Sequence, residues 1–449
     1  MKTPMKISTK RRIVRHRNPD PSRRRFLQLS GVAAGSAAMG LSFTPMALGG
    51  SADQKVLVYV FLRGGIDGLC LLPPVDGADY GYYADARDRT FVDINDNDSA
   101  RRPIPLNNGQ PLGKGLGFHP YCSGLAGIYD DGGLAVIQAA GHPPGTFTRS
   151  HFDAQETIEL GQPLLTGGSG QALPSSGWLT RYLQTHPEVP APDAIFTAMV
   201  SSSTPTASLG GWPDVATLDS PDNFSPNSGR FADTHRAVLG SLYSGTGELD
   251  IAGGAALDAV DLIDGLDLDK YQPAGGVQYP DNGVGRDFRL VAQLIRREFG
   301  IACATVDVGG WDTHNSQNVF GGGFGSRVED LSEALTAFYR DLEAAGDIND
   351  VAVVVQSEFG RQVKENANHG TDHGLGNPML VLGGGVSGGR VYGPTDGIAP
   401  GARDGDSLVP RTDFRDVLGE VASGLLGNNN VDLIFQDSGY LYQPVGFSV

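Results

Sequence analysis

Short, continuous apolar runs alternate with amphipathic segments along most of the chain. Lys55–Leu62 (KVLVYVFL) and Leu134–Ala139 (LAVIQA) are rich in β-branched and aliphatic residues and end abruptly at polar or Gly-rich sequence. Such runs are typical of strands that are buried on both faces of a parallel sheet. The same pattern predicts further strands at Ile301–Val308, Val351–Val355 and Met379–Leu382, and helices from Ser150 through Leu160 and over Arg286–Phe299, Val328–Ala345 and Thr412–Leu426.

The order of these elements predicts the fold class. Strands that alternate with helices indicate an α/β protein with a doubly wound, mostly parallel sheet and helices on both faces. Residues 161–285 differ, because they are rich in Gly, Pro, Ser and Asp. This stretch has only a short strand at Ala194–Val200 and helical pieces near Arg230–Tyr243 and Ala255–Leu266. We therefore expect an insertion or cap at about 161–285 within a single domain covering 51–449.

The first fifty residues have the character of an export signal. A basic segment ends in Ser22-Arg23-Arg24-Arg25-Phe26-Leu27, and the mild apolar run Leu29–Phe43 and the small residues at 47–50 follow it. That run is too short and too weakly apolar to remain as a membrane anchor. We predict that residues 1–50 are a twin-arginine signal peptide. The expected partner is the twin-arginine translocase, and the mature protein is expected to be periplasmic or secreted.

The charge balance of the mature part excludes one class of partner. The whole chain has 34 basic and 51 acidic side chains, and residues 1–50 hold ten and one of them. The remainder therefore has 24 against 50, a formal net charge of −26. Such a surface repels nucleic acid and anionic lipid. Three cysteines, Cys70, Cys122 and Cys303, indicate no disulfide framework, although the sequence leaves open a Cys70–Cys122 pair.

Chemically capable side chains collect at the predicted ends of strands. In a doubly wound sheet, the loops beyond the carboxyl ends of the strands form the ligand crevice. Carboxylates and imidazoles there can hold a divalent cation, and a serine at a helix start can act as a nucleophile. The candidate metal ligands are Asp67, Asp312, His314, Glu358, Asp372 and His373; Ser150 is the candidate nucleophile, and Arg63 a candidate anion-binding residue.

Several of these residues also have a purely structural interpretation. Asp67 can be a turn residue among glycines, and Ser150 can be only a helix cap with Asp153 three positions on. Arg361 can neutralise Glu358, Asp372 can orient His373 rather than bind metal, and Arg63 can pair with an acid. His151, beside Ser150, is either an alternative ligand or a plain helix residue. His369 is a substitute should His373 point away, and His142 is a candidate for lining the crevice.

Five motifs in order carry a family resemblance: GGIDGL at 64–69, SHFDAQ at 150–155, GGWDTH at 309–314, SEFGR at 357–361 and GTDHG at 370–374. Together they resemble the exported bacterial family called domain of unknown function 1501, which is grouped with the alkaline-phosphatase-like and sulfatase superfamily. The resemblance covers nearly the whole mature chain. It implies an alkaline-phosphatase-like fold and a site with one or two divalent metals, of which Zn, Mn, Mg and Ca are the candidates.

Position by position, the superfamily resemblance implies metal ligands at Asp67, Asp312, His314, Glu358 and His373 and a nucleophile at Ser150. Many superfamily members have Asp-x-x-x-His where this chain has Asp312-x-His314, and Asp-His where it has Glu358-Phe359. Two hypotheses follow. The first is an exported metal-dependent hydrolase that acts on phosphate or sulfate esters of small molecules or glycans. The second is a non-catalytic exported protein that keeps the fold for metal or glycan binding or for cell-surface assembly.

Overall fold

The structure is a computed structural model that describes most of the chain beyond residue 53. The signal segment predicted at 1–50 lies outside the described residues, as does the predicted helix at Ala255–Leu266 except for Leu257. The described residues are 54–106, 114–143, 145–162, 174–189, 197–201, 205–212, 215–217, 231–247, 249–250, 253–254, 257, 271–297, 299–436 and 439–449.

The chain divides into two compact units. The smaller comprises Met1–Leu41 and Pro226–Asp258, and its described part includes helix α8 (Ala232–Leu242). The larger comprises Ser42–Ser225 and Ala259–Val449, and it contains the sheet and all the candidate site residues predicted from the sequence.

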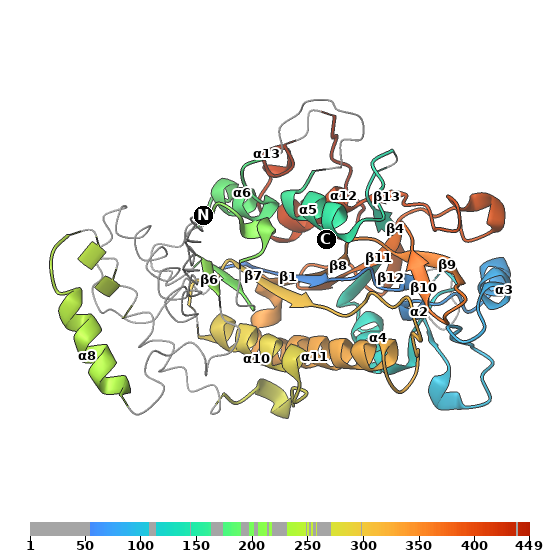
Figure 1. Cartoon of the computed structure of the whole chain (residues 1–449), viewed down its shortest axis with the longest axis horizontal. Coiled ribbons are helices and arrows are strands. Elements are labelled where there is room, and N and C mark those ends of the chain that lie inside the picture. Colours follow the sequence, from blue (N-terminus) through green and yellow to red (C-terminus); the bar gives the residue numbers. More distant parts are fainter. Residues whose placement is uncertain are drawn as a thin grey trace, which may run out of the picture. The chain divides into compact units, whose positions relative to one another are not determined.

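A nine-stranded sheet forms the centre of the larger unit (Figure 1). Its strand order is β12-β4-β11-β8-β1-β7-β5-β6, with β13 also paired to β4. Every pair is parallel except those of β11, which runs antiparallel to both β4 and β8. The strands are β1 (Val56–Leu62), β4 (Leu134–Gly141), β5 (Ala198–Val200), β6 (Val215–Thr217), β7 (Cys303–Val308), β8 (Val351–Ser357), β11 (Asn377–Gly383), β12 (Arg390–Tyr392) and β13 (Thr412–Asp413).

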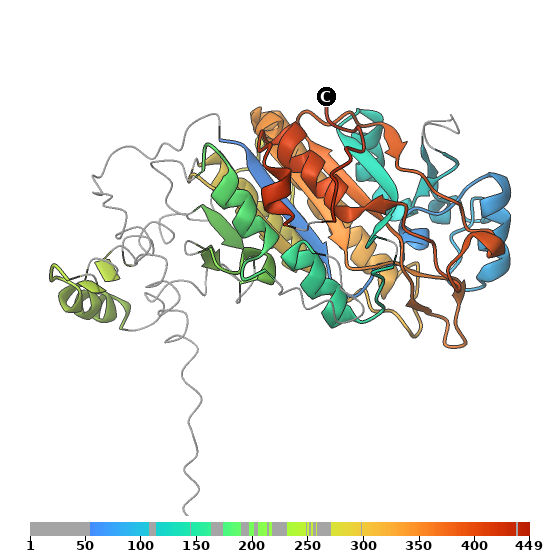
Figure 2. The ribbon, with the colours of Figure 1, turned by 90° about the horizontal axis from the view of Figure 1, so that it is seen from above.

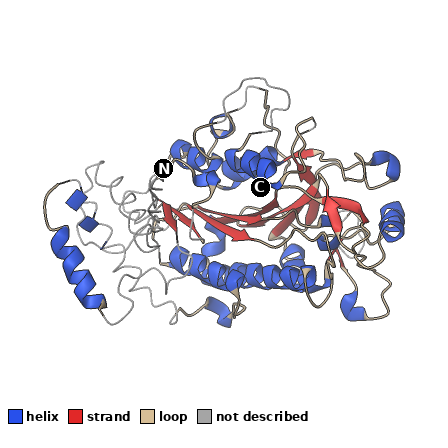
Figure 3. Ribbon diagram, viewed as in Figure 1, coloured by secondary structure: helices blue, strands red, loops and turns tan. Residues whose placement is uncertain are grey.

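Helices cover both faces of this sheet, as Figures 1 and 3 show. Successive side chains of a strand point to opposite faces. Val58 and Val60 of β1 accordingly join one apolar cluster, and Tyr59 and Phe61 join the other. The first cluster lies under α4 (Ser123–Asp130), α10 (Gly283–Arg296) and α11 (Phe324–Ala345). The second lies under α5 (His151–Leu160), α6 (Trp178–Thr185), α12 (Phe414–Glu420) and α13 (Val431–Ile434). The predicted doubly wound α/β class is confirmed.

Local sequence signals fix the ends of the long helices. Helix α5 begins where the Ser150 hydroxyl accepts a hydrogen bond from the amide of Asp153, and it ends at Gly161 in the left-handed conformation. Helix α11 likewise ends at left-handed Gly346. Glycine adopts this conformation without steric cost, so it stops helices at these points. Figure 2, from above, shows helices that lie over the sheet and run roughly along its strands.

The range predicted as insertion contains part of the sheet. Strands β5 and β6 lie within 161–285 and extend the sheet beyond β7 by parallel pairing. Strand β5 falls within the short strand predicted at Ala194–Val200. Strand β6 was not predicted, because three residues in Gly- and Ser-rich surroundings show no strand pattern. The range predicted as a cap thus includes two strands of the sheet.

Short elements complete the larger unit. Helices α2 (Gly68–Leu71) and α3 (Gly77–Ala86) follow β1, and β2 (Ile104–Pro105) pairs with β3 (Gly117–Phe118). Strands β9 (Arg361–Glu365) and β10 (Thr371–His373) form a separate antiparallel pair. Cys70, Cys122 and Cys303 are all buried free thiols. None of the helices in the described part of the chain is long and apolar enough to span a membrane.

Candidate metal centre

The candidate site lies at the carboxyl ends of three neighbouring strands. Leu62 of β1 pairs in register with Val308 of β7 and with Ser357 of β8, so the loops that follow these strands start side by side. One loop carries Asp312 and His314, and Glu358 directly follows β8. The start of α5 and strand β10 bring further side chains to the same place.

Four side chains converge there: His151, Asp312, His314 and His373, which we call the His-Asp cluster. The Nε2 atoms of His314 and His373 are 2.8 Å apart. Oδ1 of Asp312 lies 3.0 Å from Nε2 of His314, 3.2 Å from Nε2 of His373 and 3.4 Å from Nε2 of His151. Potential ligand atoms of His151, Asp312 and His373 all lie within 4.8 Å of one another.

The other nitrogen of each imidazole is committed to a hydrogen-bond acceptor. Nδ1 of His151 is 2.8 Å from Oε1 of Glu358, and Nδ1 of His314 is 2.9 Å from Oδ1 of Asp372. Nδ1 of His373 is 2.7 Å from the carbonyl oxygen of Arg149. Because these oxygens only accept, each Nδ1 carries a proton, and the Nε2 atom of each ring faces Asp312.

This arrangement fits a bound cation. The Nε2 atoms of three imidazoles face one carboxylate oxygen, while each Nδ1 is already used by its own acceptor. The Nε2 of His151 is buried and has no hydrogen-bond partner in the described part of the chain. Metal-binding histidines almost always donate their second ring N–H to a carboxylate or carbonyl, as all three rings do here. The cluster is therefore a possible His/Asp metal site.

The buried guanidinium of Arg361 helps to keep Asp312 ionised. Burial raises the pKa of Asp312 and is the largest single contribution. Arg361, through its hydrogen bond and its charge, lowers the pKa most, and together with the neighbouring histidines it brings the value to about 2. Nη2 of Arg361 lies 2.7 Å from Oδ1 of Asp312, and the guanidinium is fully buried. The same guanidinium also donates to the carbonyl oxygens of four residues around the cluster: Gly64, Gly65, Trp311 and Thr371.

Glu358 lies behind the cluster and orients His151. Its Oε1 accepts hydrogen bonds from Nδ1 of His151, from Nε2 of Gln155 and from the amide of Gly64, each at 2.8 Å. Burial favours the neutral acid, yet these donors hold the pKa of Glu358 below its usual range. The same hydrogen bond raises the pKa of His151. Glu358 thus contacts a candidate ligand rather than occupying a ligand position.

Two glycines allow the loops to approach this closely. A Cβ on Gly370 would lie 2.3 Å from the backbone carbonyl carbon of His314. A Cβ on Gly64, whose φ is 120°, would lie 2.6 Å from the backbone nitrogen of Asp312. Real Cβ atoms do not come so close to backbone, so any side chain at either position forces the loops apart.

The structure does not bring Asp67 into the His-Asp cluster. Asp67 is fully buried, and its Oδ2 accepts hydrogen bonds from Arg87 at 2.6 Å and from Gln317 at 2.7 Å. Its Oδ1 caps the short helix α2. Although burial opposes ionisation, Arg87 keeps the pKa of Asp67 below its ordinary value. These contacts match the structural interpretation of Asp67, in which it is a turn residue, rather than the metal-ligand interpretation.

Ser150 and Arg63 lie at the margins of the site. The Ser150 hydroxyl accepts from the Asp153 amide at 3.4 Å, as a helix cap does. Arg63 pairs with Glu159 at 2.6 Å and with Asp307 at 2.9 Å. Burial lowers the pKa of Arg63, but the two carboxylates outweigh this and raise it. Both partners of Arg63 are thus protein acids.

Two residues have larger roles than the sequence predicted. His151 belongs to the cluster, and Arg361, expected to neutralise Glu358, pairs with Asp312 instead. The signal for His151 was its place at the start of α5, one residue after Ser150, which turns its ring towards the sheet edge. Asp372 orients His314, whereas the sequence had suggested that it orients His373. His369 bonds Glu365 at 2.8 Å instead of the cluster.

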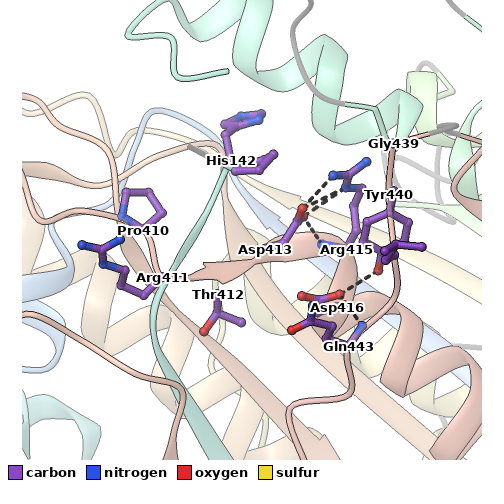
Figure 4. Close-up of a pocket in the computed structure, with 12 residues that line it drawn as sticks. His142, Pro410, Arg411, Thr412, Asp413, Arg415, Asp416, Gly439, Tyr440 and Gln443 are labelled. Carbon is purple, nitrogen blue, oxygen red and sulfur yellow. Dashed lines mark hydrogen bonds and ion pairs between the residues drawn. The ribbon is translucent and has the colours of Figure 1, made fainter. Parts of the chain in front are cut away.

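A separate pocket of about 430 Å³ opens beside β13 and the start of α12 (Figure 4). His142, Thr412, Asp413 and Arg415 are among the residues that line it, and no member of the His-Asp cluster does. Figure 4 shows Asp413 paired with Arg415 and Asp416 bonded to Tyr440. His142 thus lines a pocket, but not that of the cluster.

Solved structures resemble the chain only distantly. The lipoteichoic acid synthase LtaP from Listeria monocytogenes is 11% identical with a TM-score of 0.31, and the match covers 92% of this chain and 80% of that one. The PsFucS1 sulfatase from Pseudoalteromonas sp. is 12% identical with a TM-score of 0.32, and 92% and 77% are covered. A protein in the alkaline phosphatase superfamily from Vibrio parahaemolyticus is 9% identical with a TM-score of 0.30, and 82% and 70% are covered.

Likenesses of this size say nothing about the reaction. No curated protein matches the chain. One family model does match, over residues 54–414, and this range includes every member of the His-Asp cluster. The chain therefore belongs to the family described as "Protein of unknown function (DUF1501)".

Proposed function

We propose that the mature protein is an exported metalloprotein whose His-Asp cluster binds a divalent transition metal and supports hydrolysis of phosphate or sulfate esters. One observation carries the metal proposal. Three imidazoles, each held at Nδ1 by its own acceptor, turn their Nε2 atoms towards one carboxylate oxygen.

The donor set favours some metals over others. Imidazole nitrogen is a preferred ligand of Zn²⁺, whereas Mg²⁺ and Ca²⁺ prefer oxygen. Three nitrogens and one oxygen therefore favour Zn²⁺ among the four ions considered, with Mn²⁺ second. A bound divalent ion of this kind polarises an ester oxygen and lowers the pKa of a bound hydroxyl or water.

Access to the cluster supports a role on an external substrate. The side chain of Asp312 is 48% exposed and that of His314 is 36% exposed. The orienting residue Asp372 is also half exposed. A purely structural metal site is normally closed, whereas a site that acts on a ligand keeps an open side.

Ser150 remains the proposed nucleophile, and two variants separate its possible roles. Ser150→Asn keeps an oxygen that can cap α5 but has no hydroxyl, and Ser150→Thr keeps the hydroxyl. We expect Ser150→Asn to lose hydrolysis of aryl phosphate and aryl sulfate, and Ser150→Thr to retain part of it. Metal content and melting temperature should match the wild type in both variants. Full activity in Ser150→Asn would rule Ser150 out as nucleophile.

The competing proposal is a non-catalytic metal- or glycan-binding protein. It is favoured by the arginines near the site, because Arg63 is paired with two acids and Arg361 is bonded to four carbonyl groups and Asp312. Both guanidinium groups are therefore already engaged by the protein and are not available to bind a phosphate or sulfate. Metal analysis of the purified mature protein, together with the two ester assays, distinguishes the proposals. Stoichiometric metal without turnover supports the non-catalytic one.

We propose export in the folded state through the twin-arginine translocase. The experiment replaces both consensus arginines, Arg23→Lys and Arg24→Lys, which keeps the charge. We expect the protein to remain in the cytoplasm, whereas Arg15→Lys, a control in the same basic segment, is exported normally. Cell fractionation with immunoblotting gives the result. Normal export of the double variant would contradict the assignment.

A further inference from the structure

Gln317 lies buried between the two segments that supply the His-Asp cluster. We propose that Gln317, held in place by Asp67, is a positioning residue that locks the 312–314 loop to strand β10 and so sets the geometry of the metal centre. The inference rests on the proposed metal site and extends it to residues that contact no metal.

The hydrogen bonds of Gln317 have only one consistent direction. Nε2 lies 2.7 Å from Oδ2 of Asp67, and the ionised carboxylate only accepts, so the amide must turn its NH₂ group towards Asp67. Oε1 then faces the opposite way, where it accepts from the hydroxyl of Thr313 at 2.9 Å and from that of Thr371 at 2.8 Å. A flipped amide would lose the bond to Asp67 and set its oxygen against the carboxylate.

The two threonines belong to the two ligand-bearing segments. Thr313 stands between Asp312 and His314, and Thr371 lies two residues before His373. Successive residues of an extended segment point in opposite directions. The side chain of Thr313 therefore points away from the cluster, towards Gln317, when the two ligands beside it point inwards.

Backbone bonds bring these segments together but leave their side chains free. The amide of Thr371 donates to the carbonyl of Thr313 at 3.1 Å, and that of Gln317 donates to the carbonyl of His369 at 2.9 Å. The Gln317 side chain adds one acceptor shared by the two segments. It is 0% exposed, so water does not compete for these bonds.

Asp67 connects Gln317 to the sheet. It lies in the loop that follows β1, and Arg87 donates hydrogen bonds to both of its carboxylate oxygens, at 2.6 and 3.1 Å. A buried ion pair with this geometry holds its members in one place. The chain of contacts then runs from Arg87 through Asp67 and Gln317 to the threonines. Asp67 acts on the centre through Gln317 rather than as a ligand.

The test removes one hydroxyl at a time in the full mature protein. Thr371→Val and Thr313→Val keep the side-chain shape but lose the bond to Gln317, whereas Thr371→Ser and Thr313→Ser keep the hydroxyl. Thr180→Val is the matched control for Thr371→Val. Thr180 of α6 is fully buried, as Thr371 is, and its hydroxyl donates to the carbonyl of Gly210, away from the cluster. Zn²⁺ affinity is measured by chelator competition, and the Co²⁺ form by its visible absorption spectrum.

We expect each valine variant to bind Zn²⁺ about 10- to 100-fold more weakly, the range typical of lost outer-shell contacts. The Co²⁺ absorption bands should shift as well. The serine variants should restore affinity to near the wild-type value. Thr180→Val should leave affinity and spectrum unchanged even where it lowers the melting temperature.

The outcomes separate this inference from the proposed function. Wild-type affinity and an unchanged Co²⁺ spectrum in both valine variants would overturn the positioning role while leaving the metal centre intact. A wild-type protein that binds neither Zn²⁺ nor Co²⁺ would overturn the proposed function, and this inference with it. Where a valine variant fails to fold, Thr371→Ala and Thr313→Ala, which add no apolar methyl group, replace it.

Discussion

Asp67 and Asp312 occupy equivalent places in the sequence, but their surroundings in the molecule are opposite in character. Each follows a buried parallel strand at the same edge of the sheet, and each lies next to glycines or an aromatic residue. Asp67 is fully buried with both oxygens bonded to protein donors. Asp312 is 48% exposed and faces three imidazoles. The strand edge brings an acid to the crevice, but the nearest donors decide whether it can bind a metal.

The largest expected effect is on stability, from Asp67→Ala. This change leaves the Arg87 guanidinium buried without its partner, and breaking such a pair costs about 3–5 kcal/mol. Denaturant unfolding of the metal-free protein gives the free energy. The same substitution at Asp312 should change the stability of the metal-free protein by less than about 1 kcal/mol, because the Asp312 side chain is 48% exposed and water can take its place beside Arg361. Equal losses of unfolding free energy in the two variants would show that Asp67 and Asp312 do not differ in their contribution to stability.

Asp312→Ala should produce the largest loss in metal binding. It removes the one anionic oxygen that all three Nε2 atoms face, so we expect Zn²⁺ affinity to fall at least about 100-fold, roughly 3 kcal/mol. Isothermal titration or chelator competition measures it. Asp93→Ala, an acid remote from the cluster that bonds Tyr80, is the control. Tight Zn²⁺ binding by Asp312→Ala would show that the metal lies elsewhere.

Gly370→Ala should affect both regions at once. The added Cβ meets the backbone of His314, so the β10 segment must move away from the 312–314 loop. We expect a loss of about 2–3 kcal/mol in stability and weaker metal binding in the same variant. Gly132→Ala is a sterically open comparison, with no atom within 4 Å of its Cβ, although its φ of 82° adds backbone strain. Unchanged metal affinity in Gly370→Ala would mean that the loops tolerate separation.

The smallest predicted effect is a pH dependence from buried histidines outside the cluster. Burial lowers the pKa of His119 and of His142 to about 4, and they are therefore neutral in the folded protein at neutral pH. The unfolded chain takes up these protons below pH 6.5, so stability falls as pH drops from about 6.5 towards 4. We expect a loss of about 1–2 kcal/mol for each histidine between pH 7 and pH 5.

His119→Gln tests this effect, because glutamine can still donate to the carbonyl of Val319, the partner of His119 Nε2. Unfolding free energies of the metal-free protein at pH 7 and pH 5 should differ less in this variant than in the wild type. An identical pH dependence of stability in the two proteins would show that His119 does not contribute to it.

The sequence predicted the parts of the fold that carry strong periodic signals. Strands β1, β4, β7 and β8 are long apolar runs, and their carboxyl ends correctly marked the edge where Asp312, His314 and Glu358 lie. Strand β5 lies within the short strand predicted at Ala194–Val200, whereas β6 was missed, because three residues cannot show a period. Strands β9 and β10 have five and three residues and are mostly polar, so the segment around Asp372 and His373 was predicted to be a loop.

Side-chain partnerships were beyond the sequence. The sequence spacing of Asp67 and Arg87 does not predict an ion pair, because an irregular turn and helix α3 separate them. His151 was recognised only as an alternative ligand, because a histidine on an amphipathic helix has no periodic mark of function. Its partner Glu358 lies 207 positions away, so only the folded chain shows that the two meet.

The reversed direction of β11 has a consequence for finding sites of this kind. In a parallel strand the chain reaches the crevice after the strand, but β11 runs the other way, so the chain reaches the crevice before it. That is why Asp372 and His373 precede a strand, while Asp312, His314 and Glu358 follow one. A search for catalytic residues in relatives with this strand order should look upstream of the antiparallel strand as well as downstream of its neighbours.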